Sequence, residues 1–231
     1  MNTAPPSPRA ILFDWDHTLV DNWAAILEAL NTTLAAMGQR TWTTAETRVR
    51  VRKSLRDSFP EMFGTRWREA RDTFYATFAA RHLETLQPLP GAADMLAAFH
   101  EAGLYLGVVS NKTGEYLRRE ADHLGWDRYF AKLVGATDAE EDKPAAAPVE
   151  MALEGSDIAC GPEVWFVGDG AIDMECAHNA GCTPVLLGGD QWKQDEFGPD
   201  EEPRLRVGSC MELAELVRNL YPDLSVVRHS S

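Results

Sequence analysis

The chain has 231 residues, which allows one large domain or a core with an inserted second domain. Its 22 basic and 36 acidic residues give a formal net charge of -14 at pH 7, which argues against nucleic acid or an anionic membrane surface as the main partner. Any anionic substrate must therefore be held by local positive charge.

The first apolar run, AILFDW at residues 10–15, predicts a buried strand whose end carries two acids, Asp14 and Asp16. An unpaired buried carboxylate is among the costlier groups in a protein core. Something in the fold must therefore compensate for these two side chains.

A helix is predicted soon after this strand. Apolar residues from Trp23 to Met37 recur at helical spacing, with Asn22 placed as the N-cap and Gly38 as the C-cap. The pattern is typical of an amphipathic helix between the two caps.

Two further helices are predicted in the same region. Thr43 and Glu46 have the spacing of a capping box and open a helix that continues through the basic stretch RVRVRKSLR. A third helix is predicted over residues 64–86, where large apolar residues fall on one side. Residues 21–87 are therefore expected to be helical throughout.

Beyond this region, helices and strands alternate regularly. Helices are predicted over residues 91–103, 113–125, 147–155 and 171–181, strands over 104–110, 132–136, 164–169 and 183–189, and a closing strand end and helix over 207–224. Such alternation requires crossover connections, and these produce a parallel sheet with helices on both faces. The sequence therefore predicts a doubly wound α/β core at residues 1–20 and 88–231, with an all-helical insert at 21–87.

Polar side chains gather at the carboxyl ends of the predicted strands, where doubly wound sheets bind their ligands. Four distant segments supply them: Asp14 and Asp16, Ser110 and Asn111, Lys143, and Asp169 and Asp173. Clustered carboxylates repel one another unless a hard cation neutralises them, and oxygen ligands suit Mg²⁺. A carboxylate that faces a neutralised phosphate can attack phosphorus, and a second acid can protonate the leaving oxygen. The pattern indicates phosphoryl transfer by covalent catalysis.

At these residues the sequence resembles the haloacid dehalogenase (HAD) superfamily of phosphohydrolases. DWDHT fits the DxDx(T/V) motif, VVSN the strand-end serine or threonine, DKP the lysine motif and GDGAID the GDxxxD motif. The insert at residues 21–87 looks like the helical cap of the phosphoglycolate phosphatase-like branch. Two residues depart from the pattern: His17 stands where Gly or Asn is usual, and Gly170 where Ser or Thr is common. These departures concern geometry and substrate and leave the reaction class unchanged.

The resemblance implies a role for each polar residue. Asp14 would be the nucleophile, and Asp16 the general acid and base. Mg²⁺ would be held by Asp14, the main-chain carbonyl of Asp16 and Asp169, with Asp173 supporting it. The phosphoryl group would be bound by Ser110, Lys143 and the backbone of Asn111.

The cap also carries a basic run: Arg48, Arg50, Arg52, Lys53 and Arg56. An ordinary exposed helix face is the favoured interpretation for any one of these residues. Arg52 and Lys53 are nevertheless the candidates to meet a substrate carboxylate, because a second anion needs a second positive site in so acidic a protein. Phosphoglycolate is the first-choice substrate, on the resemblance alone.

Three other functions share parts of this pattern. A phospho-Asp signalling module would need neither the cap nor the acid Asp16. A phosphonate hydrolase of the same superfamily would have a small residue at position 16 and a Schiff-base lysine in the cap, for which Lys53 is a lone candidate. A sugar-phosphate mutase would use the same four motifs, so the core sequence leaves that alternative open.

The remaining features concern location and partners. The four cysteines, Cys160, Cys176, Cys182 and Cys210, are too scattered for a disulfide framework or a paired zinc site. The N-terminus has no apolar signal region, and no stretch approaches the roughly 20 apolar residues of a membrane span. We expect a cytoplasmic monomer or weak homodimer that acts on a small phosphorylated metabolite and binds neither nucleic acid nor membrane.

Overall fold

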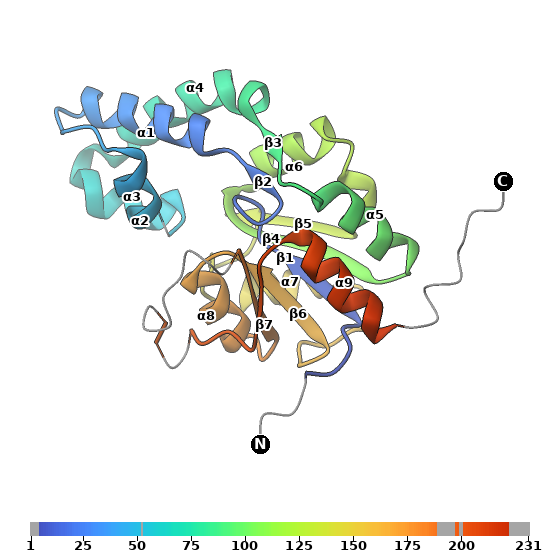
Figure 1. Cartoon of the computed structure of the whole chain (residues 1–231). Coiled ribbons are helices and arrows are strands. Elements are labelled where there is room, and N and C mark those ends of the chain that lie inside the picture. The colour runs from blue at the N-terminus through green and yellow to red at the C-terminus, as the bar shows by residue number, and fades with distance from the viewer. Residues whose placement is uncertain (1–4, 52, 189–196, 199–200, 222–231) are drawn as a thin grey trace.

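The computed structural model describes residues 5–51, 53–188, 197–198 and 201–221. Within them lies a six-stranded parallel sheet of order β5-β4-β1-β6-β7-β8 (Figure 1). Its strands are β1 (Ala10–Phe13), β4 (Tyr105–Thr113), β5 (Lys132–Ala136), β6 (Val164–Gly168), β7 (Thr183–Leu187) and β8 (Leu205–Val207). The doubly wound α/β fold predicted from the sequence is confirmed.

Helices cover both faces of this sheet. On one face lie α5 (Ala92–Glu101), α6 (Gly114–His123) and α9 (Cys210–Leu220). On the other lie α7 (Ala147–Leu153) and α8 (Ala171–Asn179). No helix in the described part of the chain is both long enough and apolar enough to span a bilayer.

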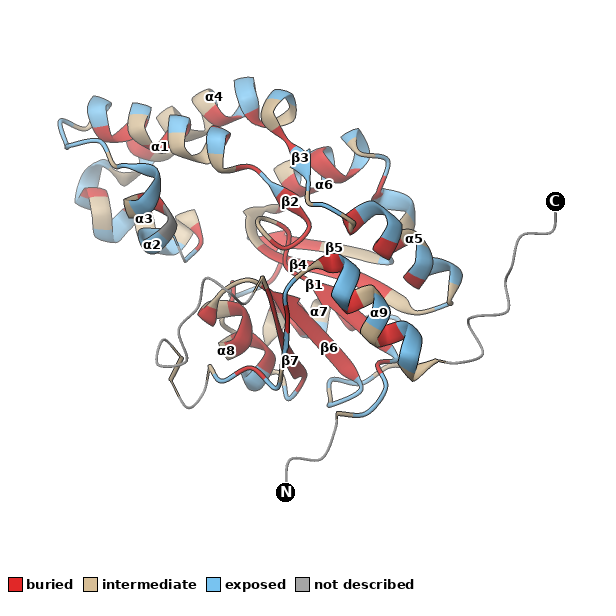
Figure 2. Cartoon of the chain, viewed as in Figure 1, coloured by how far each residue is buried: buried red, intermediate tan, exposed pale blue. Residues whose placement is uncertain are grey.

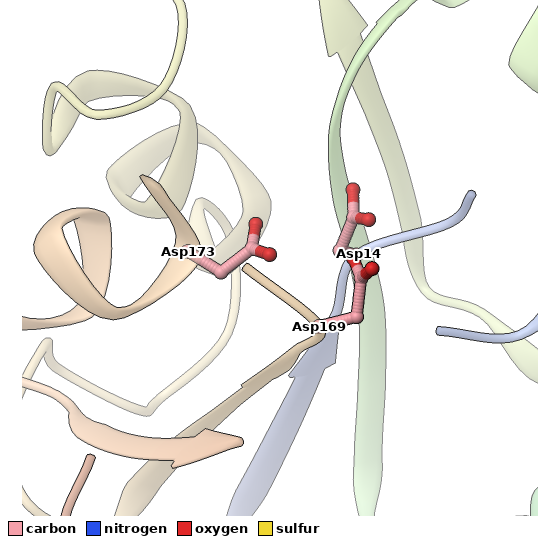
Figure 3. A group of neighbouring side chains, drawn as sticks. All are labelled: Asp14, Asp169 and Asp173. Atoms are coloured by element: carbon pink, nitrogen blue, oxygen red, sulfur yellow. The ribbon is translucent and has the colours of Figure 1, made fainter. Parts of the chain in front are cut away.

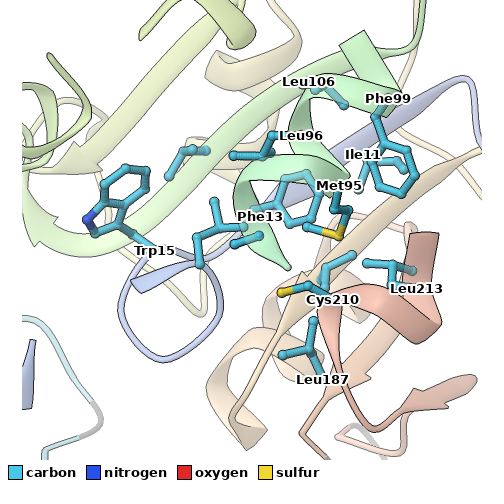
Figure 4. Packing of buried hydrophobic residues seen from close by; sticks show 14 of the residues in the cluster. Ile11, Phe13, Trp15, Met95, Leu96, Phe99, Leu106, Leu187, Cys210 and Leu213 are labelled. Carbon is cyan, nitrogen blue, oxygen red and sulfur yellow. The ribbon is translucent and has the colours of Figure 1, made fainter. Parts of the chain in front are cut away.

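The central strand β1 contributes to both hydrophobic clusters. Ile11 and Phe13 pack with α5, α6 and α9 (Figure 4). Ala10 and Leu12 pack with α7 and α8, because successive side chains of a strand point to opposite faces. All four are completely buried. An uninterrupted apolar run is what a central strand of a parallel sheet requires.

Strand β1 also marks the point where the chain reverses direction across the sheet. The next two sheet strands, β4 and β5, lie on one side of it, whereas β6, β7 and β8 lie on the other. Ligands of such sheets bind at the switch point, outside the carboxyl ends of the strands. A ligand site is therefore expected at the carboxyl ends of β1, β4 and β6.

A layer of helices is inserted between β1 and β4 and lies over this edge of the sheet (Figure 1). It consists of α1 (Trp23–Ala36), α2 (Thr44–Arg50), α3 (Leu55–Phe63) and α4 (Trp67–Thr85). Figure 2 shows buried residues concentrated in the sheet and along the inner sides of the helices. We call this layer the cap. The division into a core at 1–20 and 88–231 and a cap at 21–87 remains a prediction, which the element order supports.

The expectation that the insert is helical throughout is wrong at its two ends. The chain leaves and re-enters the core through a short antiparallel pair, β2 (Val20–Asp21) and β3 (Gln87–Pro88). Backbone pairing between these segments satisfies hydrogen-bonding groups that a helix end would leave open. The base of the cap is thus a two-stranded connection.

The predicted helix over the basic stretch is also interrupted. Helix α2 stops at Arg50, and α3 begins only at Leu55. Ser54 accepts a hydrogen bond from the backbone N–H of Asp57 at 3.4 Å, so it caps a new helix and does not lie inside one. The basic residues that the structure describes are therefore divided between α2, α3 and the connection between them.

The predicted caps of the insert have mixed outcomes. The capping box of Thr43 and Glu46 is confirmed. Gly38 follows the end of α1 with φ 74°, a left-handed conformation that favours glycine. Asn22 occupies the N-cap position of α1 but makes no capping hydrogen bond, and its Nδ2 donates to Glu120.

Candidate active site

One cavity of about 230 Å³ lies between the sheet and the cap. It is lined by all seven core residues proposed from the sequence: Asp14, Asp16, Ser110, Asn111, Lys143, Asp169 and Asp173. These residues come from the carboxyl ends of β1, β4 and β6, from the segment before α7 and from the first turn of α8. The fold thus brings the four sequence motifs to one place, although their roles remain proposals.

Lys143 lies at the centre of the acidic residues. Its Nζ donates to Asp14 Oδ1 and to Asp173 Oδ1, at 2.6 Å each, and its side chain is 2% exposed. Burial alone would lower the pKa of this ammonium, but the two carboxylates outweigh burial and raise it. Asn111 fixes the backbone of Lys143 by accepting from its N–H at 3.0 Å and donating to its carbonyl at 3.1 Å. Lys143 is therefore a fixed positive charge.

Figure 3 shows three carboxylates that lie close together at the ends of the strands. Asp14, Asp169 and Asp173 each offer an oxygen, and these atoms lie within 4.8 Å of one another. Burial, followed by repulsion from Asp173 and Asp14, raises the pKa of Asp169 well above its usual range. Burial likewise raises the pKa of Asp173 to about 6, although Lys143 opposes the shift. One ammonium does not balance three clustered acids, so this oxygen-only set fits a divalent cation.

Helix α8 approaches β6 closely enough to require a glycine. A Cβ atom added to Gly168 would lie 2.3 Å from both Cβ and Cγ of Asp173, closer than real side chains approach. Asp173 is then fixed by its Oδ2, which accepts from the N–H of Gly170 at 3.0 Å. The GDxxxD spacing therefore returns the second acid to the end of its own strand.

The two departures from the family pattern have simple local explanations. His17 has φ 65°, the left-handed conformation for which glycine is the usual residue, and its ring stacks on Trp23 with centroids 3.9 Å apart. Gly170 is in an extended conformation, and an added Cβ would lie 3.6 Å from Asp173 Oδ2, an ordinary contact. The turn at His17 is retained, and the Gly170 position accepts a side chain without requiring one.

Asp16 is held by a lysine that the sequence interpretation did not include. Lys112 Nζ donates to Asp16 Oδ1 at 2.7 Å and to Glu120 Oε2 at 2.6 Å. Burial and, to a smaller extent, Glu120 raise the pKa of Asp16, while Lys112 opposes the rise. The acid proposed to donate a proton thus lies in surroundings that favour its protonated form.

Glu120 is the second residue that was missed, and His82, which contacts it at 2.8 Å, is the third. Both side chains are completely buried. Glu120 follows Leu117 by three residues on the buried face of α6, and His82 follows Phe78 by four on the buried face of α4. An ionisable residue on the apolar face of a predicted helix was therefore a signal available in the sequence.

The basic run of the cap is largely engaged by protein groups. Arg52 lies outside the described residues. Lys53 lines the cavity and pairs with Glu61 at 3.2 Å, both side chains being more than half exposed. Arg56 donates from Nε to Asp142 Oδ2 at 3.0 Å, and so joins α3 to the segment that carries Lys143. A substrate anion at Lys53 would therefore compete with Glu61.

Aromatic and aliphatic side chains form the rest of the cap wall. Those that line the cavity include Trp23, Trp42, Phe59, Phe74, Tyr75 and Phe78. Tyr75 also hydrogen-bonds to Thr113 at the end of β4. The cap therefore closes the cavity with apolar surface and contacts the core on more than one side.

Comparison with known proteins identifies the family of this chain and its relatives. A sequence model of the haloacid dehalogenase-like hydrolase family matches residues 11–187. The phosphoglycolate phosphatase of Xanthomonas campestris pv. campestris (strain 8004) is 31% identical over 182 residues, covering 77% of this chain and 82% of that protein. The phosphoglycolate phosphatase of Photorhabdus laumondii subsp. laumondii is 28% identical over 187 residues, covering 78% and 80%. These matches confirm the enzyme class expected from the motifs, a phosphatase, and favour it over a signalling module.

Solved structures show the same fold. A HAD-superfamily hydrolase from Ehrlichia chaffeensis has a TM-score of 0.64 and 26% identity, covering 94% of this chain and 99% of that one. A haloacid dehalogenase-like family protein from Streptococcus pneumoniae has a TM-score of 0.77 and 21% identity, covering 91% and 98%. With the family match spanning most of the core and the whole cap, this chain belongs to the haloacid dehalogenase-like hydrolase family.

Proposed function

We propose that the chain is a Mg²⁺-dependent phosphoric monoester hydrolase that forms an aspartyl-phosphate at Asp14. The observation that carries the proposal is the position of this carboxylate at the switch point of the sheet. Asp14 accepts from Lys143 at 2.6 Å and shares the acidic cluster with Asp169 and Asp173. A nucleophile, a fixed positive charge and a set of cation ligands thus meet at one point.

In the proposed reaction a carboxylate oxygen of Asp14 attacks the phosphorus of the ester. The bond from phosphorus to the alcohol oxygen breaks, and Asp16 gives its proton to that oxygen. Water then attacks the phosphorus of the aspartyl-phosphate, Asp16 takes a proton from the water, and the bond to Asp14 breaks to release inorganic phosphate. Lys143 and Ser110 hold the phosphoryl oxygens, where charge develops in the transition state.

Mg²⁺ would be held by Asp14, Asp169 and the main-chain carbonyl of Asp16, with Asp173 as support. The ion would neutralise the acids and the incoming phosphate. The oxygen-only donor set and the raised pKa values of Asp169 and Asp173 support this assignment.

Phosphoglycolate is the first substrate to test, because the curated relatives are named for it. Arg52 and Lys53 are the residues proposed to meet its carboxylate. A sugar-phosphate mutase remains the alternative, since it would use the same core residues and hold the phosphoenzyme against water. We keep a cytoplasmic monomer or weak homodimer as the expected form of the protein.

Release of inorganic phosphate from a panel of esters tests the proposed function. Phosphoglycolate, a sugar phosphate and p-nitrophenyl phosphate are each assayed with Mg²⁺ and with excess chelator. We expect hydrolysis with Mg²⁺, loss of activity in chelator and recovery when Mg²⁺ is restored. Full activity in excess chelator would contradict the metal assignment, and isomerisation of the sugar phosphate without phosphate release would favour a mutase.

The free energy of unfolding of the metal-free protein should depend on pH, and Mg²⁺ should suppress this dependence. The pKa of Asp173 rises from a usual value of 3.8 to about 6 on folding, so the folded, metal-free protein binds more protons than the unfolded chain in this window. The free energy of unfolding should therefore fall as pH rises from about 4 to about 6, by up to roughly 3 kcal/mol for a shift of this size.

Chemical denaturation in chelator, for the wild type and Asp173→Asn, measures this contribution as the difference between the two proteins. The fall should be smaller in the variant, where burial still raises the pKa values of Asp169 and Asp16, and saturating Mg²⁺ should suppress it in the wild type. Identical dependence of the unfolding free energy on pH for the two proteins in chelator would show that folding does not raise the pKa of Asp173.

A further inference from the structure

Glu120 accepts hydrogen bonds from four side chains. Its Oε1 accepts from Asn22 Nδ2 at 2.9 Å and from His82 Nδ1 at 2.8 Å. Its Oε2 accepts from Trp15 Nε1 at 2.7 Å and from Lys112 Nζ at 2.6 Å. A carboxylate has about four lone-pair sites, so this one is fully used. Glu120 is therefore a fully hydrogen-bonded, buried carboxylate that connects the core to both ends of the cap.

Two of the four donors, Asn22 and His82, come from the two connections of the cap. Asn22 lies immediately before α1, where the chain enters the cap, and His82 lies in the last turn of α4, where it leaves. The other polar ring or amide atoms of these two residues, His82 Nε2 and Asn22 Oδ1, are buried without a protein hydrogen-bond partner in the described part of the chain. Burying an unpaired acceptor is costly, so the bond to Glu120 is the contact for which these polar side chains are placed here.

Lys112 connects Glu120 to Asp16, the proposed proton donor. Its Nζ lies between Glu120 and Asp16, and its side chain is only 5% exposed. The ring of Phe78, from cap helix α4, covers the ammonium with its centroid 5.5 Å away. A buried ammonium with two carboxylate partners has little freedom to move, so it fixes the oxygen of Asp16 to which it donates.

We propose that Lys112 and Glu120 are positioning residues that hold Asp16 at the leaving group and make its placement depend on how the cap is seated. The inference rests on the proposed function, in which Asp16 protonates the leaving alcohol oxygen. If the cap connections move away, the Glu120 carboxylate loses two of its four donors, Asn22 and His82, and becomes a less rigid anchor for Lys112. The proton donor is then in place only when the cap covers the cavity, and the phosphoenzyme forms where bulk water is excluded.

The test uses the dependence of the rate on the leaving group. An alkyl phosphate needs its alkoxide protonated as it leaves, whereas p-nitrophenolate leaves with little help. The kcat/KM value reports formation of the phosphoenzyme, so it isolates the step in which Asp16 donates. For Lys112→Met we expect kcat/KM to fall roughly hundredfold for an alkyl phosphate and less than about fivefold for p-nitrophenyl phosphate. The matched control is Lys132→Met, which removes a lysine whose side chain is 42% exposed and pairs with Glu154 at 3.9 Å, and it should change neither value.

A double-mutant cycle shows whether Lys112 acts through Asp16. In an Asp16→Asn background, Lys112→Met should leave the ratio of the two kcat/KM values unchanged within about twofold, because the donor is already absent. His82→Gln tests the connection to the cap and should give the same selective loss, on the order of tenfold for the alkyl ester. His123→Gln, on an exposed position of α6, is its control.

Equal losses on both esters in Lys112→Met would overturn the inference, because they would indicate a role in phosphate binding or in folding. So would unchanged rates on both. If Lys112→Met does not fold by circular dichroism, the selectivity of His82→Gln decides in its place. Failure of the wild type to hydrolyse either ester with Mg²⁺ would refute the proposed function itself, and the inference with it; hydrolysis by the wild type with no selective loss in the variants refutes the inference alone.

Discussion

Asp14→Asn should abolish turnover of every ester, with a loss on the order of 10⁴-fold or more in kcat. An amide has nearly the volume of the carboxylate, but it is a poor nucleophile and carries no charge for a cation. Asp14 follows a strand that is buried on both faces, so the isosteric change should leave the fold intact. Steady-state kinetics with Mg²⁺ measures the loss of kcat, and circular dichroism shows whether the fold is intact.

The control for this variant is Asp94→Asn, which changes an exposed acid in the first turn of α5. It should behave as the wild type. Activity of Asp14→Asn within tenfold of the wild type would mean that another group attacks phosphorus, and the proposed covalent mechanism would have to be abandoned.

Lys143→Met should reduce both stability and activity. Its side chain keeps most of the lysine volume, but it leaves Asp14 and Asp173 without the ammonium that each contacts at 2.6 Å. Breaking a buried pair by removing one partner costs about 3–5 kcal/mol of unfolding free energy, and loss of a fixed charge at a phosphoryl group costs roughly 10²–10³ in kcat/KM. Denaturant unfolding in chelator and phosphate release with Mg²⁺ measure the two losses.

Mg²⁺ separates the two roles of Lys143. Saturating Mg²⁺ should restore much of the lost stability, because the ion neutralises the same acids, but it should not restore kcat/KM. The control is Lys132→Met. Lys132 pairs with Glu154, whose side chain is 74% exposed, so loss of this pair should cost less than about 1 kcal/mol of unfolding free energy. Stability of Lys143→Met equal to that of the wild type in chelator would show that the acids are not held by this lysine.

Most of the core was predictable because its signals are local and repeated. The apolar run from Ala10 to Phe13 specifies a strand buried on both faces, and the alternation that follows residue 87 leaves a parallel sheet as the simple solution. Strand ends of such a sheet meet at one edge, so residues as distant as Asp14 and Asp169 could be grouped from the sequence alone.

The rest could not be predicted because it depends on contacts between distant segments. Glu120 and Lys112 are eight residues apart and belong to different elements, and only the folded cap brings His82 to them. The break between α2 and α3 was missed because no apolar repeat at helical spacing ends within the basic stretch. Only one residue, the N-cap Ser54, marks where the new helix starts. The left-handed turn at His17 was not predicted, although a position where Gly or Asn is usual is one where a left-handed conformation is common.

Detection of the phosphoenzyme tests the central claim most directly. Asp16→Asn is mixed with a phosphate ester and Mg²⁺, because loss of the base should slow hydrolysis of the intermediate and let it accumulate. The reaction is quenched in acid and treated with borohydride, which converts an aspartyl-phosphate to homoserine, and the peptides are examined by mass spectrometry. We predict homoserine at position 14 only after exposure to substrate; an unmodified Asp14 in protein that turns over the ester, or modification at another residue, would contradict the mechanism.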